Sequence, residues 1–335
     1  MISLKTPRGL PVEVPESLHE DPSPRFSVAD TAAARAYYEE NGYVIFRDLF
    51  TPQTCDEMRR LWDRDIKPYK GYIYRQATAR AETHIKNANG WIMNPILNLQ
   101  SVDPVRFAEF RSTSVRRVLA DKQLRTVFTS LLNEAPKVVQ SMYFEGNSAT
   151  WEHQDSYYLD SEVVGEMVAA WIALEDIAPH AGRFFICPGS HRIRLKDHSL
   201  YNNIAENHDT YIKSVVEEIR TRKLEIRAPA LGKGDVLLWN SLTIHGSLDS
   251  QDPRHSRSSI TAHAIPLSRK FLQLQTRVLT LRTEDVDGTA IYRPKDLGST
   301  VNRLIFFVET NFPQFFYWLK KRAILYFVRR KAATA

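Results

Sequence analysis

The chain has 335 residues, of which 43% are apolar and 25% are charged, a composition typical of a soluble globular protein. This composition excludes a disordered or low-complexity chain, and no run reaches the roughly eighteen apolar residues of a membrane-spanning helix. The formal net charge is +6, and residues 310–335 alone hold six lysines and arginines and no acidic residue. The rest of the chain is therefore neutral, which predicts a basic tail and no nucleic-acid-binding face.

The N-terminal part combines an irregular arm with two helices. Residues 1–27 hold five prolines and little hydrophobic periodicity, so we expect an extended arm that lies on the domain or is mobile. Asp30 can cap a helix that Gly42 ends, and a short strand is predicted at 43–46. The Thr-Pro pair at 51–52 then provides the cap and first-turn proline of a second helix.

The next segment has a less regular pattern. Residues 67–100 are rich in Tyr, Asn and Ile, and two interpretations stay open: a lid or substrate-facing loop, or a packed irregular connection. Helical spacing of apolar residues returns at 104–119 and 122–132, which predicts two helices packed against a sheet.

From residue 138 onward the pattern changes to short strands. The predicted strands span 138–144, 149–155, 167–175, 183–187, 234–240, 257–265 and a later run at 271–281. A charged, helical-looking insertion at 195–227 interrupts them. Helices that precede a run of strands indicate helices packed against one face of an antiparallel sheet system.

A histidine and a carboxylate stand two residues apart at His153 and Asp155. Side chains alternate along a strand, so both can face one metal ion from the same side. His245 is the best candidate for a third ligand, and two histidines with one carboxylate form the facial triad of non-haem Fe(II) oxygenases. The pair alone is a weak signal, because an isolated histidine is more often a satisfied surface or loop residue.

Arg257 lies twelve residues after His245 and opens an apolar-alternating run. A strand that starts there would place the guanidinium beside the metal, where it can clamp a carboxylate through two hydrogen bonds. The alternative interpretation is an ordinary surface charge on a strand.

Further motifs surround these residues in a fixed order. They are Glu40-Asn41-Gly42-Tyr43-Val44, Val139-Gln140-Ser141-Met142, His153-Gln154-Asp155, Trp171-Ile172-Ala173-Leu174-Glu175-Asp176, Pro188-Gly189-Ser190-His191, Gly234-Asp235-Val236, His245-Gly246-Ser247 and Arg257. Through them the chain resembles the phytanoyl-CoA dioxygenase-like Fe(II)/2-oxoglutarate oxygenases over about residues 37–265. One such motif is weak, whereas all of them in order are specific.

The resemblance implies a mostly β fold with flanking helices, a double-stranded β-helix (jelly roll, cupin-like) with iron at one open end. Together with the patterns above it divides the chain into three segments. These are an extended N-terminal arm at 1–27, an Fe(II)/2-oxoglutarate oxygenase domain at 28–285 and a C-terminal segment with a basic aromatic helix at 286–335.

The resemblance also implies the cofactors and the residues that hold them. Fe(II) would be bound by His153, Asp155 and His245, with 2-oxoglutarate and O₂ as co-substrates. Arg257 completes the predicted catalytic set, because it would pair with the distal carboxylate of 2-oxoglutarate. Three more residues match family positions around that co-substrate: Gln140, Trp171 and the hydroxyl of Ser247. For Trp171 the alternative is an ordinary aromatic of the core.

Five other residues have weaker assignments. Arg183 stands where the family more often has a small or uncharged residue, and it would favour an anionic substrate if it points inward or be a solvated charge if it points outward. His191 belongs to a turn that the family shares and is expected to be structural. His263 alternates with apolar neighbours and could face the pocket or the core, whereas His84 and His180 have no partner spacing.

The C-terminal segment mixes aromatic and basic residues, most densely at 312–331. This composition is typical of a helix that lies on an anionic membrane surface. The alternative is a helix packed on the domain or on a second subunit, so a homo-oligomer stays open. The two cysteines, Cys55 and Cys187, suggest no disulfide framework, and no signal peptide is visible, which favours the cytoplasm, with peripheral attachment to the inner face of the membrane.

Three functions compete. The favoured one is an Fe(II)/2-oxoglutarate-dependent hydroxylase acting on a lipid-linked or anionic sugar at a membrane, since the chain is similar to Kdo 3-hydroxylases, which modify an inner-core sugar of lipopolysaccharide. The second is a hydroxylase of a soluble natural product or acyl-thioester. The third is a non-catalytic cupin-like binding protein, which would have no need of the whole His, Asp, His and Arg set.

Overall fold

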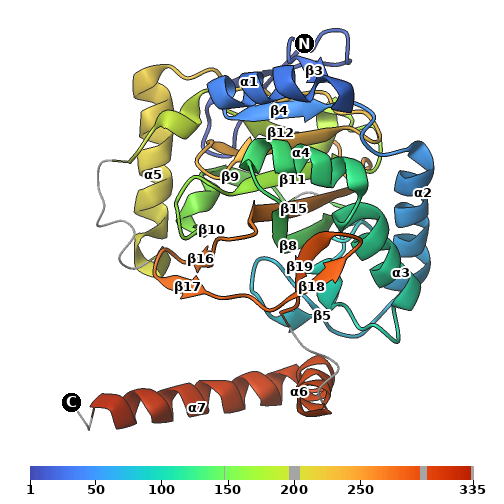
Figure 1. The fold of residues 1–335 in the computed structure, drawn as a ribbon, viewed down its shortest axis with the longest axis vertical. Coiled ribbons are helices and arrows are strands. Elements are labelled where there is room, and N and C mark those ends of the chain that lie inside the picture. Colours follow the sequence, from blue (N-terminus) through green and yellow to red (C-terminus); the bar gives the residue numbers. More distant parts are fainter. Residues whose placement is uncertain (147, 196–203, 295–299, 333–335) are drawn as a thin grey trace.

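The computed structural model describes residues 1–146, 148–195, 204–294 and 300–332, and is a mixed α/β protein built around one large sheet (Figure 1). The path through this sheet runs β18 (Thr283–Val286), β19 (Thr289–Tyr292), β8 (Pro136–Phe144), β15 (Ser259–Pro266), β11 (Val168–Ala173), β13 (Val236–Asn240), β4 (Tyr43–Phe46) and β3 (Arg25–Phe26), with β7 (Ile96–Leu97) paired to β8. The central pairs are antiparallel, as predicted.

Two three-stranded sheets accompany the main sheet among the described residues. One has the order β12 (Phe184–Ile186), β14 (His245–Ser247) and β9 (Thr150–His153), and the other has β10 (Leu159–Ser161), β16 (Phe271–Gln273) and β17 (Arg277–Leu279). All of the strands predicted from the pattern are present. The predicted domain boundary between residues 285 and 286 falls inside β18. This strand forms a hairpin with β19, and β19 pairs with β8 of the main sheet.

The two faces of the main sheet are covered differently. Along β11, Val168, Ala170 and Ile172 face the helices, whereas Ala169, Trp171 and Ala173 face the small sheet β12–β14–β9. The helix layer consists of α1 (Thr31–Asn41), α2 (Pro52–Leu61), α3 (Ala108–Ser112) and α4 (Lys122–Leu132). The space between the two sheets is therefore where residues from both can meet.

The predicted helices are present, with two departures. Both the second helix and the helix predicted at 104–119 change to π-helical turns, at Trp62–Ile66 and Thr113–Leu119. The ring of Trp62 stacks on Tyr143 with 3.9 Å between centroids, which packs the first of these turns onto β8. The first helix ends at Gly42 (φ 75°), where a Cβ atom would lie 2.4 Å from Nδ1 of His191, so the His191 turn packs against this glycine.

The N-terminal arm lies on the domain and contains a hairpin that the pattern did not predict, β1 (Ile2–Lys5) with β2 (Pro11–Val14). Arg183 holds this arm in place, and neither sequence interpretation of Arg183 is correct. Its side chain is buried and donates hydrogen bonds to the carbonyl oxygens of Ile177, at 3.1 Å, and of Pro15. The guanidinium is therefore bound by main-chain carbonyls, and it is neither a solvated charge nor a cation free to meet a substrate.

The segment 67–100 is a packed connection with three short strands, β5 (Ile73–Tyr74), β6 (Ala81–Glu82) and β7. Glu145, which follows β8, accepts hydrogen bonds from Lys67 and from the main chain of Ile92, both at 2.7 Å. The packed interpretation of this segment is the one that the contacts support.

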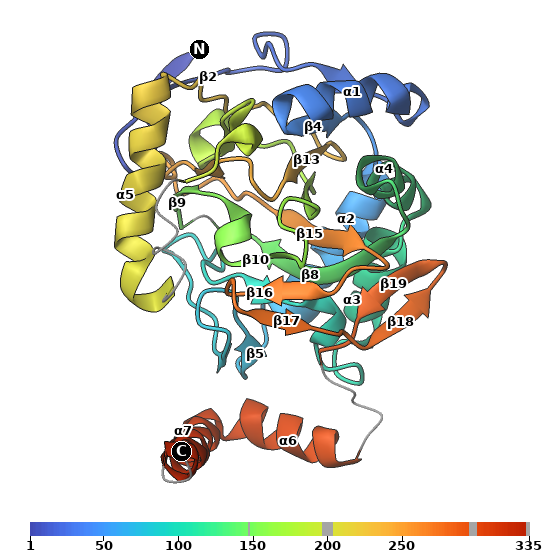
Figure 2. The same ribbon diagram turned by 60° about the vertical axis from the view of Figure 1, so that its left-hand side comes forward.

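Three helices lie outside the two main layers. They are α5 (Ile204–Arg222), in the predicted insertion, and the C-terminal α6 (Thr300–Asn311) and α7 (Pro313–Ala332). Figures 1 and 2 show α6 and α7 as a separate pair of helices beneath the main body. Among the described residues, no helix combines the length and apolar character needed to cross a membrane.

Candidate metal centre

The three predicted ligands meet between the sheets. His153 ends β9 and lies directly opposite His245 on β14, and their rings are 4.3 Å apart. The strand stops at His153, two residues earlier than predicted, but Gln154 keeps an extended backbone (φ −110°, ψ 132°). The alternation therefore continues for one more residue and brings Asp155 to the same side as His153.

The donor atoms converge on one point. The Nε2 atoms of His153 and His245 lie 3.6 Å and 3.5 Å from Oδ1 of Asp155, and one ligand atom from each residue lies within 4.8 Å of the others. The opposite ring nitrogens are engaged with main-chain carbonyls: Nδ1 of His153 with Trp151 at 2.8 Å and Nδ1 of His245 with Thr243 at 2.9 Å. These bonds place the ring proton on Nδ1 and leave the Nε2 lone pairs for a metal.

The second carboxylate oxygen of Asp155 has its own neighbours. The indole N–H of Trp239 donates to Oδ2 at 2.9 Å, and Nε2 of His263 lies 3.6 Å from the same oxygen. His263 therefore faces the site rather than the helix-side core, which answers the question that the sequence left open. Because Trp239 donates a hydrogen bond to Oδ2 and His263 lies beside it, Oδ1 is the oxygen available to bind a metal.

The protonation states suit metal binding. Burial lowers the pKa of His245 to about 3, so its imidazole is neutral at physiological pH. Burial pushes the pKa of Asp155 upward, but His245, His153 and His263 together outweigh this effect and hold that pKa well below its ordinary value. Two imidazoles and one carboxylate, all buried, fit a divalent iron ion with open coordination positions.

Arg257 is a buried cation without a carboxylate partner among the described residues. Its Nη1 donates to the carbonyl of Gly182 at 2.9 Å, whereas its buried Nε has no hydrogen-bond partner there. The guanidinium lies 5.7 Å and 5.9 Å from the ring centroids of Phe144 and Trp171. Burial lowers its pKa to about 10, so it is still charged near neutral pH, and the surface-charge interpretation is wrong.

The three remaining predicted residues lie on strands that flank this space. Trp171 is on the face of β11 toward the small sheet, Ser247 ends β14, and Gln140 on β8 is paired in register with His263. Trp171 also packs on Phe184, with 6.4 Å between ring centroids, as its core interpretation predicts, and its ring centroid lies 5.9 Å from the guanidinium of Arg257. A direct role of these three residues in 2-oxoglutarate binding stays a prediction.

Sequence reasoning missed residues that surround the ligands. Trp239 lies six residues before His245 and carries no chemical motif of its own, so only the structure reveals its bond to Asp155. Tyr158 lies 5.7 Å from His153, ring to ring, and its hydroxyl lies 2.7 Å from Nε2 of His208 on α5. The insertion therefore contributes to the surroundings of the metal site, while Trp151 beside it is 40% exposed.

Residues 38–256 match the phytanoyl-CoA dioxygenase (PhyH) family. A Caenorhabditis elegans protein described as a phytanoyl-CoA dioxygenase domain-containing protein 1 homolog is 22% identical over 300 residues, covering 77% of this chain and 98% of its own. The human peroxisomal phytanoyl-CoA dioxygenase is 21% identical, covering 70% of this chain and 68% of its own. Of the seven predicted site residues, the six other than Arg257 lie inside the matched range, as does most of the fold.

Two solved structures illustrate the shared fold. The α-ketoglutarate-dependent carbocyclase SnoK from nogalamycin biosynthesis superposes with a TM-score of 0.53 at 16% identity, covering 74% of this chain and 89% of that one. EctD from S. alaskensis with 2-oxoglutarate and 5-hydroxyectoine superposes with a TM-score of 0.51 at 17% identity, covering 87% and 95%. At these identities the likeness establishes the fold alone.

Proposed function

The chain belongs to the phytanoyl-CoA dioxygenase (PhyH) family, and we propose that it hydroxylates an unactivated C–H bond of a lipid-linked or anionic sugar at a membrane surface. It is an Fe(II)/2-oxoglutarate-dependent dioxygenase with His153, Asp155 and His245 as its facial triad. The observation that carries the assignment is the convergence of two Nε2 atoms and Oδ1 of Asp155 on one point between the sheets. We also assign the strand arrangement to a double-stranded β-helix.

Iron(II), with 2-oxoglutarate and O₂, supplies the oxidising power: 2-oxoglutarate, O₂ and R–H give succinate, CO₂ and R–OH. The protein holds and orients these reactants. The main-chain carbonyls of Trp151 and Thr243 keep the two imidazoles in the metal-binding tautomer, and Trp239 fixes the carboxylate. The enclosing sheets exclude water from the reacting atoms, since all three ligands are buried.

Arg257 is the proposed anchor for the distal carboxylate of 2-oxoglutarate. It is a buried guanidinium with an unused Nε–H, and a dianionic co-substrate would supply the missing counter-charge. Ser247 follows His245 by two residues on β14 and so points to the same side, where its hydroxyl can assist. Gln140 and Trp171 would line the same pocket.

The substrate class rests on the C-terminal helices. Their basic and aromatic surface suits a substrate embedded in an anionic membrane, and Kdo of lipopolysaccharide is the specific sugar that we propose. Arg183 no longer supports an anionic substrate, because main-chain carbonyls hold it. The exposed Trp151 beside the triad offers a flat surface for a sugar ring.

The test is turnover of 2-oxoglutarate, followed as succinate, with intact lipopolysaccharide precursor, its deacylated core and unrelated acyl-thioesters or natural products. We expect succinate formation to be coupled to hydroxylation of the sugar. Coupled turnover with a soluble natural product alone would establish the alternative substrate class. Iron binding without any turnover across the panel would favour a non-catalytic binding protein, and His245→Ala serves as the inactive control.

A further inference from the structure

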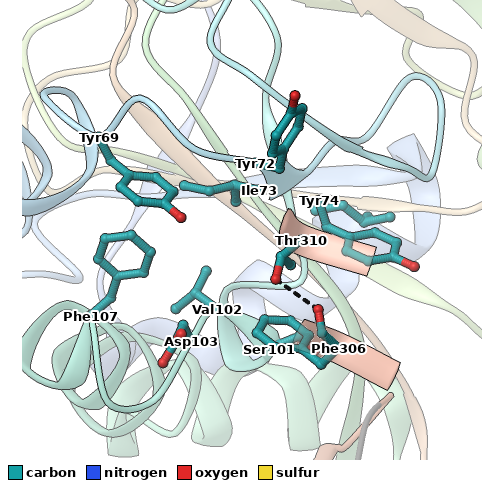
Figure 3. Close-up of a pocket in the computed structure, with 11 residues that line it drawn as sticks. Tyr69, Tyr72, Ile73, Tyr74, Ser101, Val102, Asp103, Phe107, Phe306 and Thr310 are labelled. Carbon is teal, nitrogen blue, oxygen red and sulfur yellow. Dashed lines mark hydrogen bonds between the residues drawn. The ribbon is translucent and has the colours of Figure 1, made fainter. Parts of the chain in front are cut away.

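The helix α6 is apolar on two opposite faces. Its inward face carries Phe306 and Thr310, which line a pocket with residues of the body that include Ile73, Val102 and Phe107 (Figure 3). Its outward face carries Val301, Leu304 and Phe307, which are 55% to 66% exposed. A helix whose inward face is already packed has no structural reason to be apolar on its outward face as well.

The outward apolar face continues onto α7. Phe315, Trp318 and Leu319 of α7 recur at spacings of three or four residues, which places them on one side of the helix, and Phe312 immediately precedes it. All four are at least half exposed. Phe307 and Phe312 bridge the two helices with 6.3 Å between ring centroids, and Phe315 stacks on Trp318 at 6.2 Å. We call the seven residues Val301, Leu304, Phe307, Phe312, Phe315, Trp318 and Leu319 the outer strip.

Cations border the outer strip, and the described segment 300–332 carries no exposed acidic residue. Lys320, Lys321 and Arg322 are exposed, and the guanidinium of Arg322 lies 4.4 Å from the Trp318 ring centroid. Lys320 and Lys321 also line a hollow with Trp318 and with Arg80, which belongs to the body. The one acidic residue of segment 300–332 is Glu309, and its side chain is buried.

We propose that α6 and α7 dock the enzyme onto an anionic lipid bilayer. The outer strip enters the boundary between headgroups and acyl chains, and lipid phosphates occupy the hollow between Arg80, Lys320 and Lys321. Aromatic and aliphatic side chains on one face, bordered by lysine and arginine, are the chemistry that an interfacial helix requires. The occupant is a membrane rather than a second copy, because a symmetric contact of this surface with itself would bring the same cations together.

The docking helices are fixed to the body, so they would set the orientation of the active site on the membrane. Glu309 of α6 accepts hydrogen bonds from Tyr74 of the body and, at 2.9 Å, from Tyr317 of α7. The hydroxyl of Tyr317 in turn accepts the main-chain N–H of Ala81 at 2.9 Å. A bilayer held by α7 is therefore held at a defined position relative to β5 and β6.

The experiment is co-sedimentation of the full-length protein with vesicles of phosphatidylcholine alone and with 30% phosphatidylglycerol. We expect binding to the anionic vesicles that weakens at high salt without vanishing, since salt screens charges but not apolar burial. Phe315→Asp should reduce binding at least 10-fold, and the double variant Lys320→Glu/Lys321→Glu should reduce it and remove its salt dependence. Matched controls are Val105→Asp, which places a carboxylate at an exposed apolar site elsewhere, and Lys122→Glu.

The inference extends the proposed function, but the vesicle assay measures no turnover, so the two can fail separately. Vesicle binding without turnover of any glycolipid would remove the proposed substrate and leave the docking surface. Absence of binding by the intact protein, or equal loss of binding in the two control variants, would overturn the inference. A dimer in solution that Phe315→Asp dissociates, without vesicle binding, would show that a second copy covers the outer strip.

Discussion

At Asp155 the two carboxylate oxygens have different tasks. Oδ1 faces the two ligand imidazoles, whereas Oδ2 accepts the indole N–H of Trp239 and lies near His263. Side chains behind a metal ligand orient it and raise its affinity for the metal, commonly by 10- to 100-fold. Trp239 therefore controls which oxygen meets the metal without touching the metal itself.

Trp239→Phe keeps the ring and removes this hydrogen bond. We expect the affinity for Fe(II), or for Mn²⁺ as its stand-in, to fall about 10-fold, because Asp155 becomes free to rotate. Titration calorimetry without 2-oxoglutarate measures this directly. Trp91→Phe is the matched control, since it removes an indole N–H that donates to the main-chain carbonyl oxygen of Arg254 at 3.2 Å, away from the ligands. Equal losses in both variants would contradict the assignment.

Substitution of a ligand is more severe. His245→Ala should abolish stoichiometric metal binding and turnover while the fold is retained, because one of three donors is lost and the remaining two cannot complete the facial set. Metal content and the melting temperature, measured together, separate loss of the site from loss of the fold. His255→Ala, an exposed histidine ten residues along the chain, should behave as wild type.

Arg257 should determine the Michaelis constant for 2-oxoglutarate. Arg257→Lys keeps the charge but loses the planar two-pronged donor, so we expect an increase of roughly 10-fold, and Arg257→Ala should exceed it. Metal affinity in the absence of co-substrate should change little. An unchanged Michaelis constant in Arg257→Ala would mean that another residue anchors the distal carboxylate.

The local spacing of residues explains why part of this site was predictable. His153 and Asp155 are two apart in extended backbone, and His245 follows in a motif of its own, so the triad could be proposed from the sequence. Trp239 and Tyr158 could not, because their roles depend on the register of β13 with β11 and on the turn after β9. Neither contact leaves a pattern in the order of residues.

At the scale of elements, helical spacing and apolar runs identified the longer ones. Helix α4 has apolar residues at helical spacing, whereas the strands β8 and β11 are apolar runs buried on both faces, and the types of all three were predicted correctly. The hairpins β1–β2, β5–β6 and β18–β19 were not predicted, because these short strands are partly exposed and none has an unbroken four-residue apolar run like that of β4. Tertiary packing, such as Val12 and Val14 against Phe185, fixes the arm instead.

Arg183 tests how the arm is attached. Arg183→Met removes hydrogen bonds to Ile177 and Pro15 but also removes the desolvation cost of a buried cation, so we expect the free energy of unfolding to fall by about 1–3 kcal/mol. Kinetic constants for 2-oxoglutarate and substrate should stay unchanged. Chemical denaturation measures the free energy of unfolding, and succinate formation measures the kinetic constants. Arg116→Met, at an exposed arginine, is the control. A selective loss of activity on anionic substrates would restore the role first considered for Arg183.

At the scale of the whole molecule, a nearly neutral oxygenase body carries a basic pair of helices through a small junction. The charge separation was visible in the sequence, as was the aromatic content of the tail. The sequence did not show which aromatic residues of the tail face the body and which face solvent. Tyr317 turns toward the body, where its hydroxyl meets Ala81, while Phe315 and Trp318 are exposed, and only the position of α7 against β5 and β6 determines which is which.

This junction should couple membrane position to activity. Tyr317→Phe removes the hydrogen bonds to Glu309 and to the main chain of Ala81, while the outer strip stays intact. Loss of bonds to a buried carboxylate costs about 1.5–3 kcal/mol, which is roughly 10-fold or more in the docked population of α7. Hydrogen exchange of 313–323 should therefore accelerate, while the melting temperature of the body changes little.

The same variant should still bind anionic vesicles, because the surface that meets the bilayer is unchanged. Its activity on a membrane-embedded substrate should fall several-fold, since the active site is no longer held at a fixed position above the lipid, whereas activity on the deacylated fragment should persist. Tyr72→Phe removes a nearby hydroxyl that lines the pocket under α6 and serves as the control. A parallel fall in both activities, together with a lower melting temperature, would mean that α6 and α7 are part of the core that supports the metal site rather than a device for positioning it.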